Sequence, residues 1–265
     1  NSPFGCVFNS EQNRNAALGF EVVITTSQQS TPNHAGTTDT AGSSWRALRS
    51  TNEFMLGSRV MGFYDRFILP YLVNCACGGR AFQKQRERVV PNASGRVLEI
   101  GLGSGLNLPV YMPEKVTEVV GIEPSKSISQ FAQKRIDDCD FTVSVLESTA
   151  EDISLESSSF DTVLVTYTLC TIANPSKALA EMARLLKPEG QLLFCEHGVS
   201  PDESVANWQR RINPIWGAIG GGCRLDSDIP TLISQNRFII TENNSGYIPG
   251  LKSLSFNYWG AATLA

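Results

Sequence analysis

Three glycines, Gly101, Gly103 and Gly105, alternate with other residues directly after a short apolar run. This run, residues 97–100, carries one acidic residue, Glu99, and has the composition of a buried strand. Glycine permits a tight turn and the close approach of a ligand to the backbone, and the start of the helix that follows offers free N–H groups. The segment therefore predicts a loop that binds a nucleotide-like ligand.

The spacing of the three glycines distinguishes between two classes of such ligands. In the G-x-G-x-x-G fingerprint of nicotinamide-dependent oxidoreductases, the third glycine would stand at position 106, which is Leu106 in this chain. The pattern here is E-x-G-x-G-x-G, the form typical of methyltransferases that use S-adenosylmethionine. The spacing favours this ligand over NAD, and a glycine turn with only a structural role is the remaining alternative.

A second acidic residue, Glu123, ends the next apolar run and is followed by Pro124. At this position in doubly wound folds a carboxylate receives the two ribose hydroxyls of the ligand, and the structural alternative is a solvated acid at the end of a strand. After the third apolar run, Ala150 and Glu151 lie in a polar loop beside the place expected for an adenine. The two acidic strand ends and this loop together predict contacts to a nucleoside.

The elements that must position these residues alternate regularly after Pro91. Short apolar runs predict strands at residues 96–100, 118–122, 141–145, 162–166, 191–195, 237–241 and 254–258. Amphipathic patterns predict helices at residues 127–139 and 176–186, the second followed by a turn at residues 187–190. Such alternation predicts a parallel sheet with helices on both faces and ligand sites at the carboxyl ends of its strands.

The chain before this alternation has two parts. Residues 1–50 are rich in Ser, Thr, Asn, Gln and Gly, and we expect a flexible N-terminal extension without a role in the site. Residues 51–265 form the expected domain. It begins with two helical pieces within residues 54–82, interrupted by Pro70 and by Gly78-Gly79, and the second piece continues to Arg86.

Composition excludes several classes of protein. The net charge of -4 and the pI near 5.3 provide no basic surplus for a phosphate backbone, so we expect a small molecule and not a nucleic acid as the partner. No window approaches the roughly 20 consecutive apolar residues of a membrane-spanning helix. The sequence carries no signal for the oligomeric state.

The seven cysteines include no CxxC pair and lie mostly in apolar runs, which is typical of buried thiols in the reducing cytoplasm. The spacing of Cys170, Cys195 and Cys223 fits neither a metal site nor a nucleophile cluster. We therefore interpret these cysteines as buried apolar side chains. We expect neither a disulfide framework nor a metal.

These residues resemble the class I S-adenosylmethionine-dependent methyltransferases, and more narrowly their small thiol methyltransferase-like branch with its type 11 methyltransferase domain. The resemblance runs from about residue 62 to residue 260. Beyond the glycine loop it rests on six short motifs: GFYDR (62–66), TLCTI (168–172), FCEH (194–197), WQ (208–209), NPIW (213–216) and GGCRL (221–225). It implies a doubly wound, Rossmann-like α/β fold with a seven-stranded sheet whose last strand runs antiparallel. It also implies S-adenosylmethionine as the cofactor, with S-adenosylhomocysteine as its product.

The resemblance also assigns residues to the site. The residues expected to bind the cofactor are Glu99, Gly101, Gly103, Ser104, Gly105, Asn107, Glu123, Pro124, Ala150, Glu151, Thr166 and Tyr64. Residues 166–169 follow the fourth strand and are expected to face the methyl donor and the acceptor. The residues expected to contact the acceptor are Thr168, Cys170, Trp208 and Trp216.

Two residues and one segment are the candidates for catalysis. His197 follows the fifth strand at the ligand-bearing edge and is the candidate base, with a structural histidine packed under a loop as the alternative. Tyr167 is expected to close over the cofactor. Residues 201–230, with Trp208, Trp216 and three consecutive glycines, are interpreted as a helical lid over a small apolar acceptor, with ordinary helix packing as the alternative.

Three functions remain open at this point. The first is transfer of a methyl group to the sulfur of a small thiol or sulfide, since thiolate is a strong nucleophile and displacement needs mainly positioning and exclusion of water. The second is methylation of nitrogen or carbon in a lipid head group, a quinone or another metabolite, because one fold serves all these acceptors. The third is binding of S-adenosylmethionine without catalysis. Mammalian members of the branch carry an apolar membrane anchor before the domain, and because this sequence shows none, we do not carry membrane attachment over.

Overall fold

The computed structural model describes residues 78–265, which lie in the second of two units, Phe63–Ala265. The predicted N-terminal extension, the helical pieces before residue 78 and Tyr64 lie outside the described residues. The seven strands and two helices that the sequence predicts after Pro91 all lie within the described residues.

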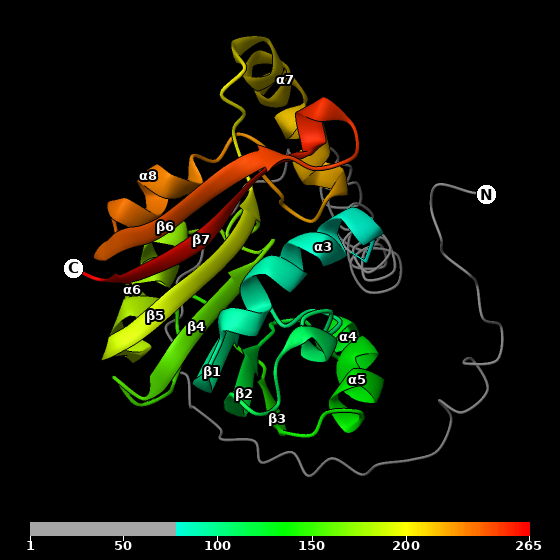
Figure 1. The fold of residues 1–265 in the computed structure, drawn as a ribbon. Coiled ribbons are helices and arrows are strands. Elements are labelled where there is room, and N and C mark those ends of the chain that lie inside the picture. Colours follow the sequence, from blue (N-terminus) through cyan, green and yellow to red (C-terminus); the bar gives the residue numbers. More distant parts are fainter. Residues whose placement is uncertain (1–77) are drawn as a thin grey trace, which may run out of the picture. The chain divides into compact units, whose positions relative to one another are not determined.

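Seven strands form one sheet in the order β3-β2-β1-β4-β5-β7-β6 (Figure 1). The strands are β1 (Gly95–Ile100), β2 (Val116–Ile122), β3 (Thr142–Leu146), β4 (Phe160–Thr166), β5 (Leu186–His197), β6 (Phe238–Tyr247) and β7 (Phe256–Leu264). Strands β1 to β5 pair in parallel, and β7 runs antiparallel between β5 and β6. The predicted doubly wound fold with an antiparallel last strand is confirmed.

Helices cover both faces of this sheet (Figure 1). The helices are α3 (Arg80–Val89), α4 (Lys126–Ser129), α5 (Gln133–Asp137), α6 (Pro175–Leu185), α7 (Glu203–Ile219) and α8 (Ile229–Ser234). Helix α3 confirms the prediction of a helix that continues to Arg86. Within residues 78–265, no helix combines the length and the apolar composition needed to cross a membrane.

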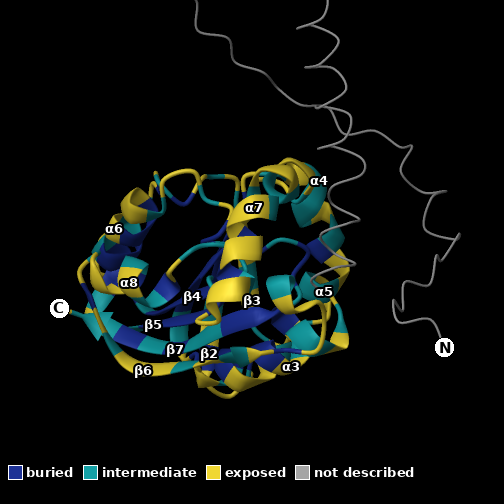
Figure 2. Cartoon of the chain, turned by 90° about the horizontal axis from the view of Figure 1, so that it is seen from above, coloured by how far each residue is buried: buried dark blue, intermediate teal, exposed yellow. Residues whose placement is uncertain are grey.

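The core has two halves because alternate residues of a strand point to opposite faces of the sheet. Leu98 and Val163 pack with residues of α6 and α8 on one face, whereas Val97 and Leu164 pack with residues of α3 and α5 on the other. Figure 2 shows the buried strands between helices whose outer surfaces are exposed. Burial of both faces explains why the central strands read as continuous apolar runs in the sequence.

Strand β5 begins earlier than predicted. Residues 187–190, expected as a turn, belong to β5, because Leu186 is already extended at the end of α6 and pairs with Phe160. The register shifts before Thr162 pairs with Gln191, which accommodates the extra residues of β5. The end of α6 was predicted to within one residue, and the turn was wrong.

The helix predicted at residues 127–139 is three short pieces: α4, a 3₁₀ turn (Gln130–Ala132) and α5. Ser125 caps the start of α4 by accepting a hydrogen bond from Ile128 N at 3.4 Å. The hydroxyl of Ser129, where α4 ends, donates to Lys126 O at 3.1 Å and competes with a regular helix there. Strand β6 is longer than predicted. Strand β7 starts at Phe256, after a 3₁₀ turn (Lys252–Leu254) where the strand was expected to begin.

The carboxyl ends of β1, β2, β4 and β5 meet at one edge of the sheet. Ile100 at the end of β1 pairs with Ile122 of β2 on one side and with Val165 of β4 on the other. Thr166 at the end of β4 pairs with Cys195 of β5. The chain reverses direction across the sheet between β1 and β4, and ligands of doubly wound sheets bind at such a reversal.

Gly260 provides a test of how tightly β7 is held between its neighbours. It pairs with Phe194 of β5 and Asn243 of β6, and a Cβ at this position would overlap the carbonyl group of Glu242. Backbone within a sheet has little freedom to move, so we expect Gly260→Ala to lower the free energy of unfolding by about 2 kcal/mol. The measurement is a urea unfolding curve.

The matched control is Gly246→Ala in the partner strand β6. A Cβ there would lie 3.8 Å from Trp259 Cη2, which is ordinary contact. This variant should unfold close to the wild-type midpoint. Equal midpoints for the two variants would contradict the close approach of β6 and β7 at Gly260.

Candidate ligand-binding site and its neighbouring cluster

The glycine loop leaves β1 and turns against the end of β2. The amides of Gly101 and Leu102 both donate to the carbonyl oxygen of Ile122, at 2.9 and 3.1 Å. Gly101 has a φ of +72°, and a Cβ there would overlap the side chain of Thr168, so this glycine brings the loop after β4 against the loop after β1. Gly103 has a φ of +57°, and its Cβ would approach only Gly101 O, at 3.8 Å. Gly103 therefore faces open space and not protein.

Glu123 closes this loop from the end of β2. Its Oε2 accepts a hydrogen bond from Gly103 N and its Oε1 accepts one from Ser125 N, both at 3.0 Å. Burial raises the pKa of Glu123 above its usual value, although both backbone donors act in the opposite direction. Each carboxylate oxygen keeps a further lone pair, so the fixed carboxylate can accept hydrogen bonds from hydroxyl groups of a ligand.

Asn107 connects β1 and β4 beneath the loop. Its Nδ2 donates to Glu99 Oε1 at 2.9 Å and to Thr166 Oγ1 at 3.0 Å, and the Tyr111 hydroxyl donates to Glu99 Oε2 at 2.7 Å. Asn107 is 3% exposed, and its Oδ1 has no hydrogen-bond partner among the described residues. Buried polar atoms are normally paired. The side chain is thus fixed through Nδ2 and offers a buried acceptor that an N–H donor of a ligand would satisfy.

These groups line a cavity of about 440 Å³ at the carboxyl edge of the sheet. The predicted cofactor-binding residues in its lining are Gly101, Gly103, Ser104, Asn107, Glu123, Pro124, Ala150, Glu151 and Thr166. Tyr167 and Thr168 also line it, together with Thr171, Ile172, Ala173 and the Gly220-Gly221 end of α7. Nine of the predicted cofactor-binding residues therefore surround one space, as a shared ligand requires.

Other predicted residues lie outside this lining: Glu99, Gly105, Cys170, His197, Trp208 and Trp216. Glu99 is buried behind the loop, where it holds Asn107, and a Cβ on Gly105 would lie 2.9 Å from Leu108 Cδ1. Trp208 is 60% exposed on α7, which Figure 2 shows as largely exposed. The structure therefore does not bring Trp208 together with the cavity, and of the predicted lid only the glycine end of α7 lines it.

Tyr167 is held in an unusual conformation between the cavity and the sheet. Its φ is +54°, a region sparsely populated by residues other than glycine. Its hydroxyl donates to Asn257 Oδ1 at 2.8 Å, and its ring packs edge-on against Phe82 with centroids 4.9 Å apart. Burial raises the pKa of Tyr167 well above its usual value, so the hydroxyl stays protonated.

Glu196 is a site residue that sequence reasoning missed. It is fully buried in β5, and its Oε1 accepts hydrogen bonds from the amides of Thr168, at 2.7 Å, and Leu169, at 3.1 Å. Burial raises its pKa to about 7. Glu196 therefore fixes the loop that lines the cavity after β4. The available signal was an acid at the end of an apolar run, the same signal that identified Glu123.

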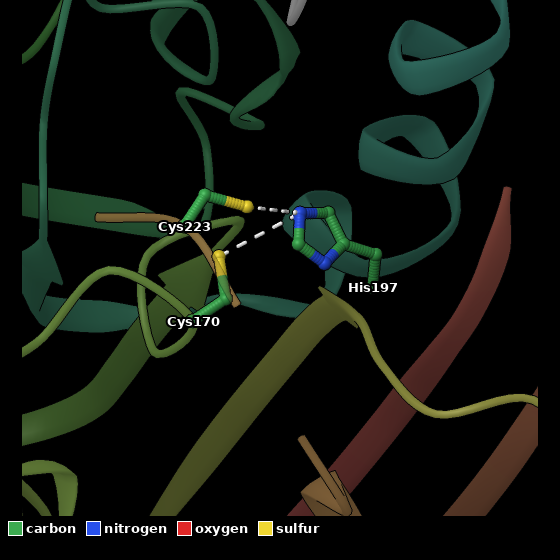
Figure 3. A group of neighbouring side chains, drawn as sticks. All are labelled: Cys170, His197 and Cys223. Carbon is green, nitrogen blue, oxygen red and sulfur yellow. Dashed lines mark hydrogen bonds between the residues drawn. The ribbon is translucent and has the colours of Figure 1, made fainter. Parts of the chain in front are cut away.

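Cys170, His197 and Cys223 converge beside this loop (Figure 3). His197 Nε2 lies 3.6 Å from Cys170 Sγ and 3.1 Å from Cys223 Sγ. Both cysteines are buried, as predicted, but they contact an imidazole and not only apolar neighbours, because the fold joins segments far apart in the sequence. Cys195 is not a member, and its Sγ lies 3.5 Å from the Tyr167 hydroxyl.

The cluster is electrostatically coupled. Hydrogen bonding from Cys170, and then from His197 and Trp216 Nε1, holds the pKa of Cys223 far below that of an ordinary thiol, against the effect of burial. Burial lowers the pKa of His197, but the adjacent Cys223 outweighs it and the pKa is raised overall. An imidazole whose Nε2 already contacts two sulfur atoms is poorly placed to act as a base, so the basic role of His197 stays a prediction without support from its position.

Comparison with known proteins agrees with the predicted family and fold. Residues 98–194 match the methyltransferase domain family. The chain is 36% identical to thiol S-methyltransferase TMT1B of Rattus norvegicus over 54% of this chain and 59% of that protein. It is 30% identical to thiol S-methyltransferase TMT1A of Homo sapiens over 62% of this chain and 68% of that protein. The match to the rat protein thus spans less than two thirds of that protein's length.

A solved structure has the same fold. The crystal structure of an S-adenosylmethionine-dependent methyltransferase from Thermotoga maritima superposes with a TM-score of 0.54 at 24% sequence identity. The superposition covers 77% of this chain and 98% of that one. At this identity the likeness concerns the fold alone.

The buried Glu99 predicts a pH dependence of stability. Burial raises its pKa to about 7, against the hydrogen bonds from Tyr111 and Asn107, whereas an exposed glutamate titrates near 4.5. The folded chain therefore binds the Glu99 proton more tightly than the unfolded chain does. The stabilisation that this gives is full below about pH 4.5 and is lost as the pH rises to about 7. Glu99→Gln, which is neutral and of equal size, should become more stable relative to wild type over this range, by about 3 kcal/mol at most.

The measurement is urea unfolding of both proteins without ligand at several pH values between about 5 and 8. The difference between the two proteins isolates Glu99 from the other buried acids. A difference in unfolding free energy that stays constant with pH would show that Glu99 is ionised throughout.

Proposed function

Because the chain belongs to the class I S-adenosylmethionine-dependent methyltransferases, we propose that it binds S-adenosylmethionine in the cavity and methylates the sulfur of a small thiol. The observation that carries the first part is the convergence of Gly103, Asn107 and Glu123 on one cavity. The second part is supported by the relatives TMT1B and TMT1A, which are thiol S-methyltransferases.

Three features of the cavity fit this cofactor. Glu123 has free lone pairs at the position that receives ribose hydroxyls in doubly wound folds. Asn107 Oδ1 is a buried acceptor suited to the amino group of the methionine part. The open space beside Gly103 allows a ligand to contact the backbone, and Ala150 and Glu151 line the region expected for the adenine. When bound, S-adenosylmethionine supplies an electrophilic methyl group on a positively charged sulfur.

The lining near the cluster suits a small and weakly hydrated acceptor. Ile172, Ala173, Gly220 and Gly221 present small or apolar surfaces. His197 does not line the cavity, so a direct base from this residue is not supported. A free thiol has a pKa of about 8.5 and is ionised to a few per cent at neutral pH, whereas an alkyl amine such as a lysine side chain, with a pKa of about 10.4, is almost fully protonated. The thiol is therefore the acceptor that depends least on a dedicated base.

The chain then acts mainly by positioning. Glu196 holds the amides of Thr168 and Leu169, and Tyr167 is fixed by Asn257, so the loop after β4 presents a defined surface to the acceptor. In the transfer, the acceptor thiol releases its proton and its sulfur forms a bond to the methyl carbon. The bond from that carbon to the sulfonium sulfur breaks, and its electron pair stays on the departing sulfur. The products are a methyl thioether and S-adenosylhomocysteine.

The experiment that tests this function is a product assay with isotope-labelled S-adenosylmethionine against sulfide, alkyl thiols, amines and phenols. We expect label in methyl thioethers, and turnover that rises with the thiolate fraction of the acceptor as the pH increases. Label only in amine or phenol products would refute the thiol acceptor and leave the methyltransferase. Cofactor binding by calorimetry without any labelled product would refute catalysis.

Gly103→Val tests the position of the cofactor. Valine would place a branched side chain in the space beside the loop and would strain a backbone with a φ of +57°. We expect calorimetry to detect no binding of S-adenosylmethionine. The control is Gly246→Val on β6, which should bind as the wild type does. Unchanged affinity of a folded Gly103→Val would exclude this cavity as the cofactor site.

A further inference from the structure

Cys170, His197 and Cys223 form a cluster that the proposed transfer leaves without a role. Cys170 lies in the loop after β4, His197 ends β5, and Cys223 follows the glycine end of α7. Their three ligand-capable atoms lie within 4.8 Å of one another, and Figure 3 shows both sulfur atoms directed at Nε2 of the imidazole. Cys170 is 2% exposed and Cys223 is 7% exposed, so water hardly reaches the two thiols.

The distances within the cluster also suit a metal ion. Hydrogen bonds from Cys170 and His197 to Cys223 join the three side chains, and the two sulfur atoms lie 3.6 and 3.1 Å from His197 Nε2. A tetrahedral zinc ion, with bonds of about 2.3 Å to sulfur and about 2.0 Å to nitrogen, holds a sulfur and a nitrogen ligand about 3.5 Å apart. Cys170 Sγ lies close to this separation from Nε2, at 3.6 Å, and Cys223 Sγ, at 3.1 Å, would move outward by a few tenths of an ångström to bind the ion. Two sulfur ligands and one imidazole also form a soft donor set of the kind that zinc prefers over magnesium or calcium.

The surroundings of the cluster fit a metal site. Trp216 Nε1 donates to Cys223 Sγ at 3.3 Å, and such donors to a ligand sulfur stabilise its negative charge. Arg224 N donates to Cys170 O at 2.9 Å, which joins the two loops that carry the cysteines. Leu225, together with Ile212 and Leu254, packs around the two cysteines as an apolar shell.

The loops that carry the two cysteines also line the cavity. Thr168 and Thr171, on either side of Cys170, are in its lining, and so are Gly220 and Gly221, which precede Cys223. The cluster therefore lies directly behind loops that form the wall we assign to the acceptor. Among residues 78–265, the cluster has no fourth histidine, cysteine or acidic side chain. Three protein ligands with one open position characterise catalytic zinc sites, whereas structural sites have four.

We infer that Cys170, His197 and Cys223 bind a zinc ion whose open coordination position receives the sulfur of the acceptor thiol. The identity of this fourth ligand rests on the proposed function, whereas the binding of the ion does not.

A thiol bound to zinc gives up its proton to solvent and is a thiolate at neutral pH. Its sulfur then forms the bond to the methyl carbon, while the carbon–sulfonium bond breaks with its electron pair on the departing sulfur. The resulting thioether is neutral and leaves the ion, which keeps its charge of +2 throughout. The inference thus supplies the deprotonation for which His197, outside the lining of the cavity, is not placed.

The first experiment measures the zinc content of the purified full chain by mass spectrometry after dialysis. We expect one zinc per chain, and its loss in Cys170→Ser, Cys223→Ser and His197→Ala, each checked for folding by circular dichroism. Cys139→Ser removes a cysteine outside the cluster and should keep the zinc. Because Cys75 and Cys77 lie outside the described residues, the double variant Cys75→Ser/Cys77→Ser is a second control. Absence of zinc from the wild type after incubation with the ion, or its loss only in the second control, overturns the inference.

The second experiment replaces zinc by Co²⁺ and records the sulfur-to-cobalt charge-transfer absorption. Addition of an alkyl thiol should raise this absorption roughly 1.5-fold, from two thiolate ligands to three. An absorption that does not change when a thiol is added overturns the acceptor role of the site. The experiment uses no variant, so its result does not depend on whether a variant folds.

The two experiments separate this inference from the proposed function. Thiol methylation by a chain that contains no metal would leave the function standing and remove the zinc. A zinc-loaded chain that responds to thiols but yields no methylated product would support the site and refute the transfer.

Discussion

The pairing of β1 with β4 in the centre of the sheet is the interaction on which the ligand site depends. It places the loop after β1 beside the loop after β4, although paired residues of the two strands are 65 positions apart in the sequence. At the far end of the strands, Asp161 of β4 accepts a hydrogen bond from Arg96 N of β1 at 2.9 Å and forms an ion pair with Lys187 Nζ of β5 at 2.6 Å. At the ligand end, Asn107 bonds to both Glu99 and Thr166. Side chains therefore fix the register of the central strands at both ends. This register determines where the loops at the carboxyl edge lie relative to one another.

Three buried acids have one structural task in common. Glu99, Glu123 and Glu196 stand at the carboxyl ends of β1, β2 and β5, and each holds a segment at the cavity through hydrogen bonds. Burial raises the pKa of each of the three carboxyl groups, because it disfavours their charged form. The hydrogen bonds that these groups accept nevertheless fix the loops. Such groups cost stability unless they are well paired, and they concentrate at functional edges for that reason.

The sequence predicted those parts of the site whose residues are close together along the chain. The glycine loop and Glu123 each follow an apolar strand within a few residues, and local spacing is enough to place them at the edge of the sheet. The Cys170–His197–Cys223 cluster was missed because its members are separated by 27 and 26 residues, and their contact depends on how β5 and α7 pack. Trp208 was expected near the acceptor because of the resemblance and the lid interpretation of residues 201–230, but an apolar side chain on a helix does not by itself show which side of that helix faces the domain. The turn at residues 187–190 was wrong for a related reason: pairing with β4 overrode a local sequence that favours a turn.

The contact between Gly101 and Thr168 also constrains how this fold can change its acceptor. Because a Cβ at position 101 would overlap Thr168, the glycine loop and the loop after β4 form one packed unit. Substitutions that reshape residues 167–172 would therefore also disturb the glycine loop, so a change of acceptor through these residues would weaken the proposed binding of the donor. The segment after β5 includes the exposed face of α7 with Ile215 and Ile219, and only its Gly220-Gly221 end lines the cavity. Divergence among relatives with different acceptors should accordingly be concentrated between β5 and β6, where most residues do not line the cavity.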